Sequence, residues 1–195
     1  MGNKPDDAGI VPANQYFHLY REALMNGVDV QLAGLIWAHE LQTMVTADLT
    51  QEQAAWIPPG TANPIAAQYA HSVCAEDGVI QTVLQGKTPL FASDWAGRTG
   101  ISDPQIMATP EWSRSVTVDL PALREYATAV TAASRAYIAG LTDEDLGREL
   151  DLTAFGLGRR TVGLLLQANL IAHIHNMVGE ISALKGAQGA KGYPF

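Results

Sequence analysis

Apolar residues recur at spacings of three and four over four long stretches of the chain, the pattern of helices that bury one face. The first predicted helix runs from about Tyr16 to about Ala47, with a break near Gly27. Its apolar stripe consists of Val28, Leu32, Leu35 and Ile36, followed by His39. A short helical turn capped by Asp48 or Thr50 is expected before Pro58-Pro59-Gly60 ends regular structure.

Capping residues delimit the other three helices. The second is predicted to start at Pro64, with Asn63 as its N-cap, and to end near Leu84 before Gly86. The third begins at Asp119 and ends at Gly140, and the fourth spans about Thr161 to Leu184. These elements predict an all-α fold, a four-helix bundle with a long crossover between helices two and three.

The crossover covers residues 87–118, which is long for a bundle connection. It either lets helices two and three run parallel, or part of it folds over a pocket as a lid. No linker divides the chain, so residues 1–195 are expected to form one domain, with 1–13 a loose N-terminal segment.

Composition narrows the possible partners. The net charge is −8 and the twelve Lys and Arg residues are scattered, which argues against nucleic acid. No stretch approaches eighteen apolar residues, so no membrane span is expected. A single cysteine, Cys74, fits a reducing compartment, and we expect a cytoplasmic protein. Cys74 is interpreted as buried and inert rather than as a ligand or a reactive thiol.

Histidines on two predicted helices are the candidate chemistry. His71 lies on the second helix among small residues, which leave room around its ring. His173 lies on the inward seam of the fourth helix, which we assign to Leu166, Leu170, His173, Met177, Ile181 and Leu184. His175 is about 200° further round that helix, so only one of the pair can face a shared site. Bundles build metal sites from such facing side chains. Alternatively, each histidine is a hydrogen-bonded core or surface residue without a ligand role.

Two stretches carry a resemblance to a known family. LTQEQAAWIPPGTANPIAAQYAHSVCAEDGVIQTVLQG resembles the second-helix region of the DinB-like (damage-inducible, YfiT-like) proteins, where a Trp-Pro-Gly loop and a cap precede a helix with one histidine. LTDEDLGRELDL and VGLLLQANLIAHIHNMVGEISALKGAQGAKGYPF are similar to the family's last helix and its Gly/Pro-rich tail. The resemblance covers roughly residues 35–195.

This resemblance implies a four-helix bundle, often a homodimer, that holds nickel or zinc with three histidines. His71 matches the first ligand and His173 the second, while the third position is Met177. A thioether is a poor ligand for these divalent ions, so the metal site is altered. His175 is the possible substitute if the helix carries a π-bulge, and Glu180, Glu76 and His39 are further candidates.

Two functions follow as expectations. The first is a metal-dependent thiol transferase or isomerase, in which the metal activates a low-molecular-weight thiol such as bacillithiol or mycothiol. The second is a non-catalytic, small-molecule-binding or stress-related dimeric bundle that has lost the metal, which Met177 favours. No Ser-His-Asp set, P-loop or HExxH motif is present, so no catalytic residue is assigned. Glu76 and Asp77 are expected either to orient a ligand histidine or to be solvated on an exposed face.

Overall fold

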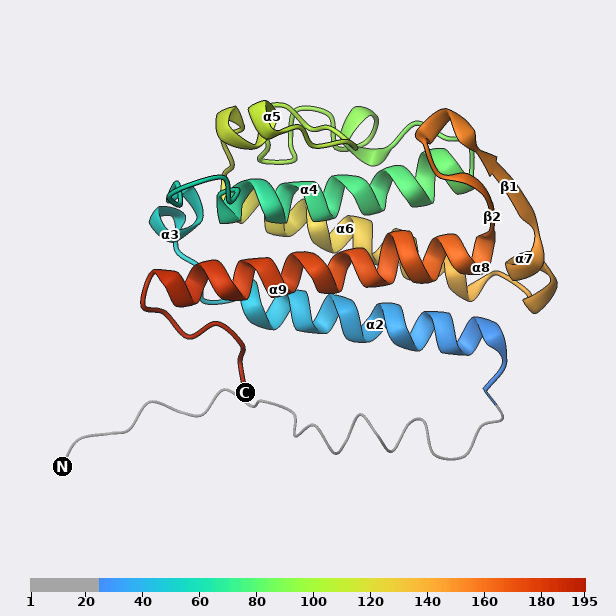
Figure 1. The fold of residues 1–195 in the computed structure, drawn as a ribbon. Helices are drawn as coiled ribbons and strands as arrows, with labels where there is room; N and C mark the ends of the chain where they lie inside the picture. Colours follow the sequence, from blue (N-terminus) through green and yellow to red (C-terminus); the bar gives the residue numbers. More distant parts are fainter. Residues whose placement is uncertain (1–24) are drawn as a thin grey trace.

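A computed structural model describes residues 25–195. The predicted beginning of the first helix at Tyr16 and the predicted loose segment 1–13 lie outside this range. Four long helical elements pack around one core (Figure 1). They are α2 (Gly27–Thr46), α4 (Ile65–Asp77) continued by η1 (Gly78–Leu84), α6 (Leu120–Ala139), and α8 (Val162–Leu165) continued by η4 (Leu166–Ile171) and α9 (Ala172–Ala187). α2 and α4 each pack against both α6 and α9.

Short elements connect these helices. They are α3 (Gln51–Ala55), the 3-10 helix η2 (Leu90–Ala92), α5 (Pro110–Ser115), α7 (Asp143–Gly147), strand β1 (Glu149–Leu152), the 3-10 helix η3 (Thr153–Phe155) and strand β2 (Gly158–Thr161). β1 and β2 form an antiparallel hairpin in which Glu149 pairs with Thr161 and Leu152 with Gly158. The all-α expectation therefore holds broadly, but it missed this hairpin. Within the described range, no helix is long and apolar enough to cross a membrane.

Side-chain caps fix most helix starts. Asn26 and Asp29 form a capping box at the start of α2, and Thr50, one of the two caps expected there, caps α3. Asp119 and Thr161, where the third and fourth helices were predicted to start, cap α6 and α8. Each cap accepts a hydrogen bond from a backbone N–H that has no partner inside its helix. The prediction for α4 was wrong by one residue, because Pro64 rather than Asn63 is its N-cap.

Two of the long helices change pitch. η1 and η4 are π-helical, so each carries wider turns than the α-helix it continues. The fourth helix also ends three residues later than predicted, at Ala187. Lys185 there is buried and donates 2.8 Å to the carbonyl oxygen of Val45, with a further bond to Asp48. This contact ties the end of α9 to the end of α2.

The segment between η1 and α6 lies along α4, on the side away from α2 (Figure 1). Asp77 anchors its first part, because its carboxylate accepts hydrogen bonds of 3.0 Å from the backbone N–H groups of Leu90 and Phe91. The indole N–H of Trp112 donates to the carbonyl oxygen of Asp103 at 2.8 Å. Earlier in the segment, Gly100 packs against the start of α6, where its positive φ and the close approach of the Asp119 backbone leave no space for a side chain.

Candidate functional site

The structure brings His71 and His173 together, although they are a hundred residues apart in the sequence. His71 projects from α4 and His173 from α9, and their ring centroids lie 4.9 Å apart with the planes inclined at 60°. Trp112 of α5 completes an aromatic group, its ring centroid 6.5 Å from that of His71. The two histidines that were predicted to face one another across the bundle therefore lie in contact.

Burial controls the protonation of this pair. Together with the weaker effect of the neighbouring His173, it lowers the pKa of His71 to about 4. Burial also lowers the pKa of His173, against the opposing effect of the Glu76 carboxylate. Both imidazoles are consequently neutral near pH 7, the form that binds metals and exchanges hydrogen bonds with neutral groups.

The predicted third ligand position does not complete a metal centre. Met177 is buried one helical turn beyond His173. The possible substitute His175 places its Nδ1 2.9 Å from the carbonyl oxygen of Ile171, and the π-helical turns precede His173 rather than separating it from His175. Across residues 25–195, no three His, Cys, Asp or Glu side chains are arranged to hold an ion. Two imidazoles and a thioether do not fit a three-histidine centre.

The other candidate ligands are bonded elsewhere. Glu180 accepts a hydrogen bond from Gln68. Glu76 Oε1 lies 2.9 Å from His39 Nε2, and the Nε–H of Arg135 donates to His39 Nδ1 at 3.2 Å. Because that nitrogen accepts, Nε2 of His39 carries the hydrogen and donates to Glu76. Arg135 of α6, His39 of α2 and Glu76 of α4 thus form a continuous row of hydrogen bonds, which we call the polar chain.

The interpretation of Glu76 and Asp77 as solvated on an exposed face was wrong, since both are buried. The Asp77 carboxylate binds the segment between η1 and α6, and the Glu76 carboxylate binds His39 of α2. The same helix buries Cys74 completely, and burial together with the nearby Asp77 raises the pKa of its thiol to about 12. A thiol in that state is protonated and unreactive, as the sequence interpretation expected.

A cavity of about 430 Å³ opens beside the histidine pair. Ile106, Met107 and Ala108 of the connecting segment form one wall, so part of that segment does cover a pocket. The β1–β2 hairpin supplies another wall. The lining is completed by α4, η1 and the last helix: His71, Ala75, Val79, Thr82, Val83, Leu152, Phe155, Leu157, Leu165, Ala168, Asn169, His173 and Asn176. We call this space the histidine pocket; Met177 is not part of its wall.

Three residues of this wall each carry a polar atom that is buried, out of reach of solvent, and without a hydrogen-bond partner among the described residues. These atoms are His71 Nδ1, Thr82 Oγ1 and Asn169 Oδ1. Thr82 lies in η1 and Asn169 in η4, so each π-helical segment carries one of them. π-helical turns are rare and occur frequently at functional sites. An α-helical periodicity gives no signal for either residue, and the sequence analysis missed both.

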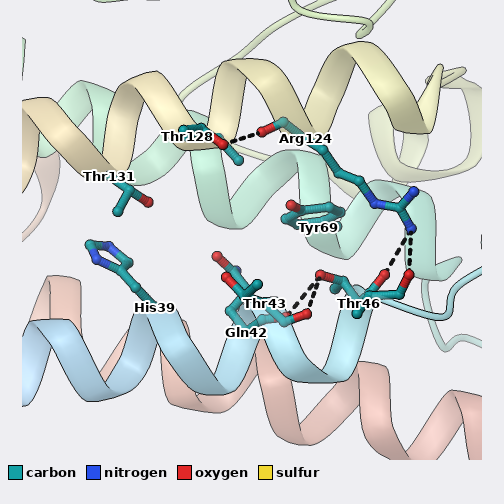
Figure 2. Close-up of a pocket in the computed structure, with 10 residues that line it drawn as sticks. His39, Gln42, Thr43, Thr46, Tyr69, Arg124, Thr128 and Thr131 are labelled. Carbon is teal, nitrogen blue, oxygen red and sulfur yellow. Dashed lines mark hydrogen bonds between the residues drawn. The ribbon is translucent and has the colours of Figure 1, made fainter. Parts of the chain in front are cut away.

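A second cavity of about 390 Å³ lies between α2 and α6, and Tyr69 of α4 lines it from between these helices (Figure 2). Its wall is rich in threonine, and its polar groups largely bind the protein itself. Arg124 donates to the carbonyl oxygens of Thr46 and Leu49 at 2.8 and 3.0 Å, which caps the end of α2. The Thr46 hydroxyl donates to the carbonyl oxygen of Gln42 at 2.8 Å. We therefore assign this cavity a structural role in joining the helices.

Comparisons with known proteins agree with this architecture. A sequence model of the DinB superfamily matches residues 35–177, a range that contains both histidines of the pair. The crystal structure of a conserved protein from Enterococcus faecalis is similar in fold, with a TM-score of 0.66 and 21% sequence identity over 83% of this chain and 99% of that one. No curated protein matches the chain.

Proposed function

Because this chain belongs to the DinB superfamily, in which one fold carries different chemistries, we propose a function from its site: it binds a small molecule in the histidine pocket. The pocket is mostly apolar, with a few polar groups that converge on it, as small-molecule sites are. Its volume of about 430 Å³ is within the range of such sites.

The observation that carries this proposal is the pair of imidazoles in the wall of the cavity, His71 and His173, whose ring centroids lie 4.9 Å apart. Neutral imidazoles can both donate and accept hydrogen bonds, and most of the remaining wall is apolar. Such a wall suits a molecule with an apolar body and a polar group. The lid-like wall at Ile106–Ala108 and the hairpin at Leu152–Leu157 would enclose that molecule.

A variant that fills the pocket tests this proposal. Ala168 is an exposed residue of the pocket rim, so Ala168→Trp should block the pocket without disturbing the core. Ala183→Trp, at an exposed position of α9 outside the wall, is the matched control. A fragment library screened by ligand-observed NMR should yield ligands that Ala168→Trp loses and Ala183→Trp keeps. Equal binding to both variants would place the ligands elsewhere and contradict the proposal.

A metal-dependent thiol transferase is the second candidate. The contact of two neutral imidazoles from α4 and α9 supports it, since both match ligand positions that the family resemblance implies. The incomplete donor set speaks against tight binding of nickel or zinc. Elemental analysis of untagged protein separates the candidates: about one equivalent of a divalent metal favours the second. The homodimer and the cytoplasmic location stay predictions.

A further inference from the structure

The histidine pocket runs along two antiparallel helices. Gln68 of α4 bonds to Glu180 of α9, and about one turn further along α4 His71 contacts His173. Residues after His71 therefore lie opposite residues before His173. The lining residues follow this arrangement in steps of about one turn, as His71, Ala75, Val79 and Val83 on one helix and His173, Asn169 and Leu165 on the other. At a rise of about 1.5 Å per residue, the stretch from His173 to Leu165 spans about 12 Å.

One end of this pocket is polar, and we call it the histidine end. His71 and His173 line the wall there, and both are only half-buried, so part of each ring is accessible. Asn176, one turn beyond His173, is exposed at the same end. A neutral imidazole donates a hydrogen bond from one ring nitrogen and accepts one at the other. The histidine end can therefore hold a polar group of a ligand.

The opposite end is apolar and lies beside the β1–β2 hairpin, so we call it the hairpin end (Figure 1). Its wall consists of Val79, Val83, Leu152, Phe155, Leu157 and Leu165. Thr82 also lines it, but the hydroxyl oxygen of Thr82 is out of reach of solvent, so only carbon atoms of that side chain can contact a ligand. Phe155 is 52% exposed, and a ligand that covers its ring removes apolar surface from water.

We infer that the histidine pocket binds a linear aliphatic molecule with one polar group, oriented with that group at the histidine end and with the chain directed to the hairpin end. This inference rests on the proposed function and adds the class of ligand and its orientation. A linear chain suits a pocket that follows two helix axes. The reverse orientation would bury the polar group among aliphatic side chains, which is costly without a hydrogen bond.

A series of 1-alkanols from butanol to decanol tests the class of ligand on the full-length protein. Isothermal titration calorimetry gives the dissociation constants. Each added CH₂ group should tighten binding about fourfold, which corresponds to about 0.8 kcal/mol per buried CH₂, until the chain fills the hairpin end.

Variants at the hairpin end test where the chain lies. Val83→Trp fills this end, so the affinity should stop rising at a shorter alkanol, whereas butanol should bind as before. Ala183→Trp, at an exposed position of α9 outside the wall, is the matched control and should not change the series. Leu157→Trp on the hairpin side provides the same test if the melting temperature shows that Val83→Trp does not fold.

Nuclear Overhauser effects between octanol and isotope-labelled protein test the orientation. The methylene group that carries the hydroxyl should lie near the ring protons of His71 and His173. The terminal methyl group should lie near the methyl groups of Val83 and Leu157. In addition, His173→Phe keeps an aromatic ring but removes its hydrogen bonds, so it should weaken octanol about tenfold and leave the contacts of the terminal methyl group in place.

The outcomes separate the inference from the proposed function. An affinity independent of chain length, or a terminal methyl group beside the histidine rings, overturns the inference and leaves the pocket as a binding site. A chain-length limit that changes in neither Val83→Trp nor Leu157→Trp also overturns it. If no alkanol binds while the fragment screen yields ligands that Ala168→Trp loses, the inference fails and the proposed function stands. If that screen fails too, both fail.

Discussion

The hydroxyl of Tyr126 on α6 donates a hydrogen bond of 2.7 Å to Asp77 Oδ2 on α4, and both residues are buried. The same carboxylate binds the backbone of Leu90 and Phe91. One side chain thus holds two long helices and the segment that covers the histidine pocket. Removing the Asp77 side chain should therefore lower the stability of the fold and displace the pocket wall.

Tyr126→Phe should lower the free energy of unfolding by about 1.5–3 kcal/mol, because it deletes a buried hydrogen bond to a carboxylate. Asp77→Ala should cost more, since it leaves three donors without an acceptor. Urea unfolding monitored by tryptophan fluorescence measures both, and Trp95, whose ring packs 5.9 Å from that of Tyr126, reports the local change. Tyr193→Phe, at an exposed position, is the control; an equal loss there would contradict the structural role of Asp77.

Stability should rise with pH between about pH 4 and 6.5, because the folded-state pKa of His71 is lowered from 6.5 to about 4. In this window the unfolded chain binds a proton that the folded chain does not, so the free energy of unfolding increases with pH. The contribution of His71 is complete above its unfolded pKa, and it is lost as the pH falls toward the folded value. The burial of His173 acts in the same direction.

Urea unfolding at several pH values tests this prediction. His71→Gln should flatten the rise, whereas His175→Gln, which leaves the contact between His71 and His173 intact, should keep it. An unchanged slope in His71→Gln would show that the ring is not buried in its neutral form.

Met177→His should create tight binding of nickel or zinc, because it restores the three-imidazole set that the family resemblance implies. We expect at least about a hundredfold gain in affinity over the native protein, measured by metal titration of untagged protein. Met177→Leu should show no gain, and His71→Ala should abolish whatever native binding exists. A folded Met177→His protein without the gain would remove the ligand assignment at position 177.

Gly78→Ala should destabilise the protein by about 1–3 kcal/mol through overpacking. A Cβ atom at Gly78 would lie 2.7 Å from side-chain carbons of Ile106, a residue of the pocket wall, so the wall must move. Gly186 is the matched control in α9, since nothing lies within 4 Å of its added Cβ. Gly186→Ala should be neutral or slightly stabilising in thermal unfolding. Equal effects of the two changes would exclude a role for the contact with Ile106.

Capping chemistry made the helix boundaries predictable. Asp119 and Thr161 are residues whose short side chains bind free backbone N–H groups, and they cap the predicted helices in the structure. The hairpin was missed because its strands have four residues each, and β1 buries only Leu152. A pattern that short does not distinguish a strand from a loop.

The candidate site was predictable only in part. Periodicity placed His173 on an inward seam, and its position on a second bundle helix paired it with His71 before the family resemblance added the ligand roles. The π-helical turns depend on tertiary packing rather than on a local pattern, which is why Thr82 and Asn169 escaped notice. The burial of Glu76 and Asp77 was not predictable either. Acidic residues are rarely buried unless they are paired, and the partners here come from distant segments of the sequence.

The polar chain from Arg135 through His39 to Glu76 has a consequence for how the bundle is specified. Apolar faces tolerate sliding along the helix axis, since one aliphatic contact replaces another at little cost. Displacing α2 by one turn relative to α4 or α6 would instead leave a buried carboxylate and a guanidinium without partners, a loss of several kcal/mol. The polar chain therefore fixes the positions of α2, α4 and α6 along their axes. Replacing its residues by hydrophobic ones should produce several coexisting packings rather than one weakened fold.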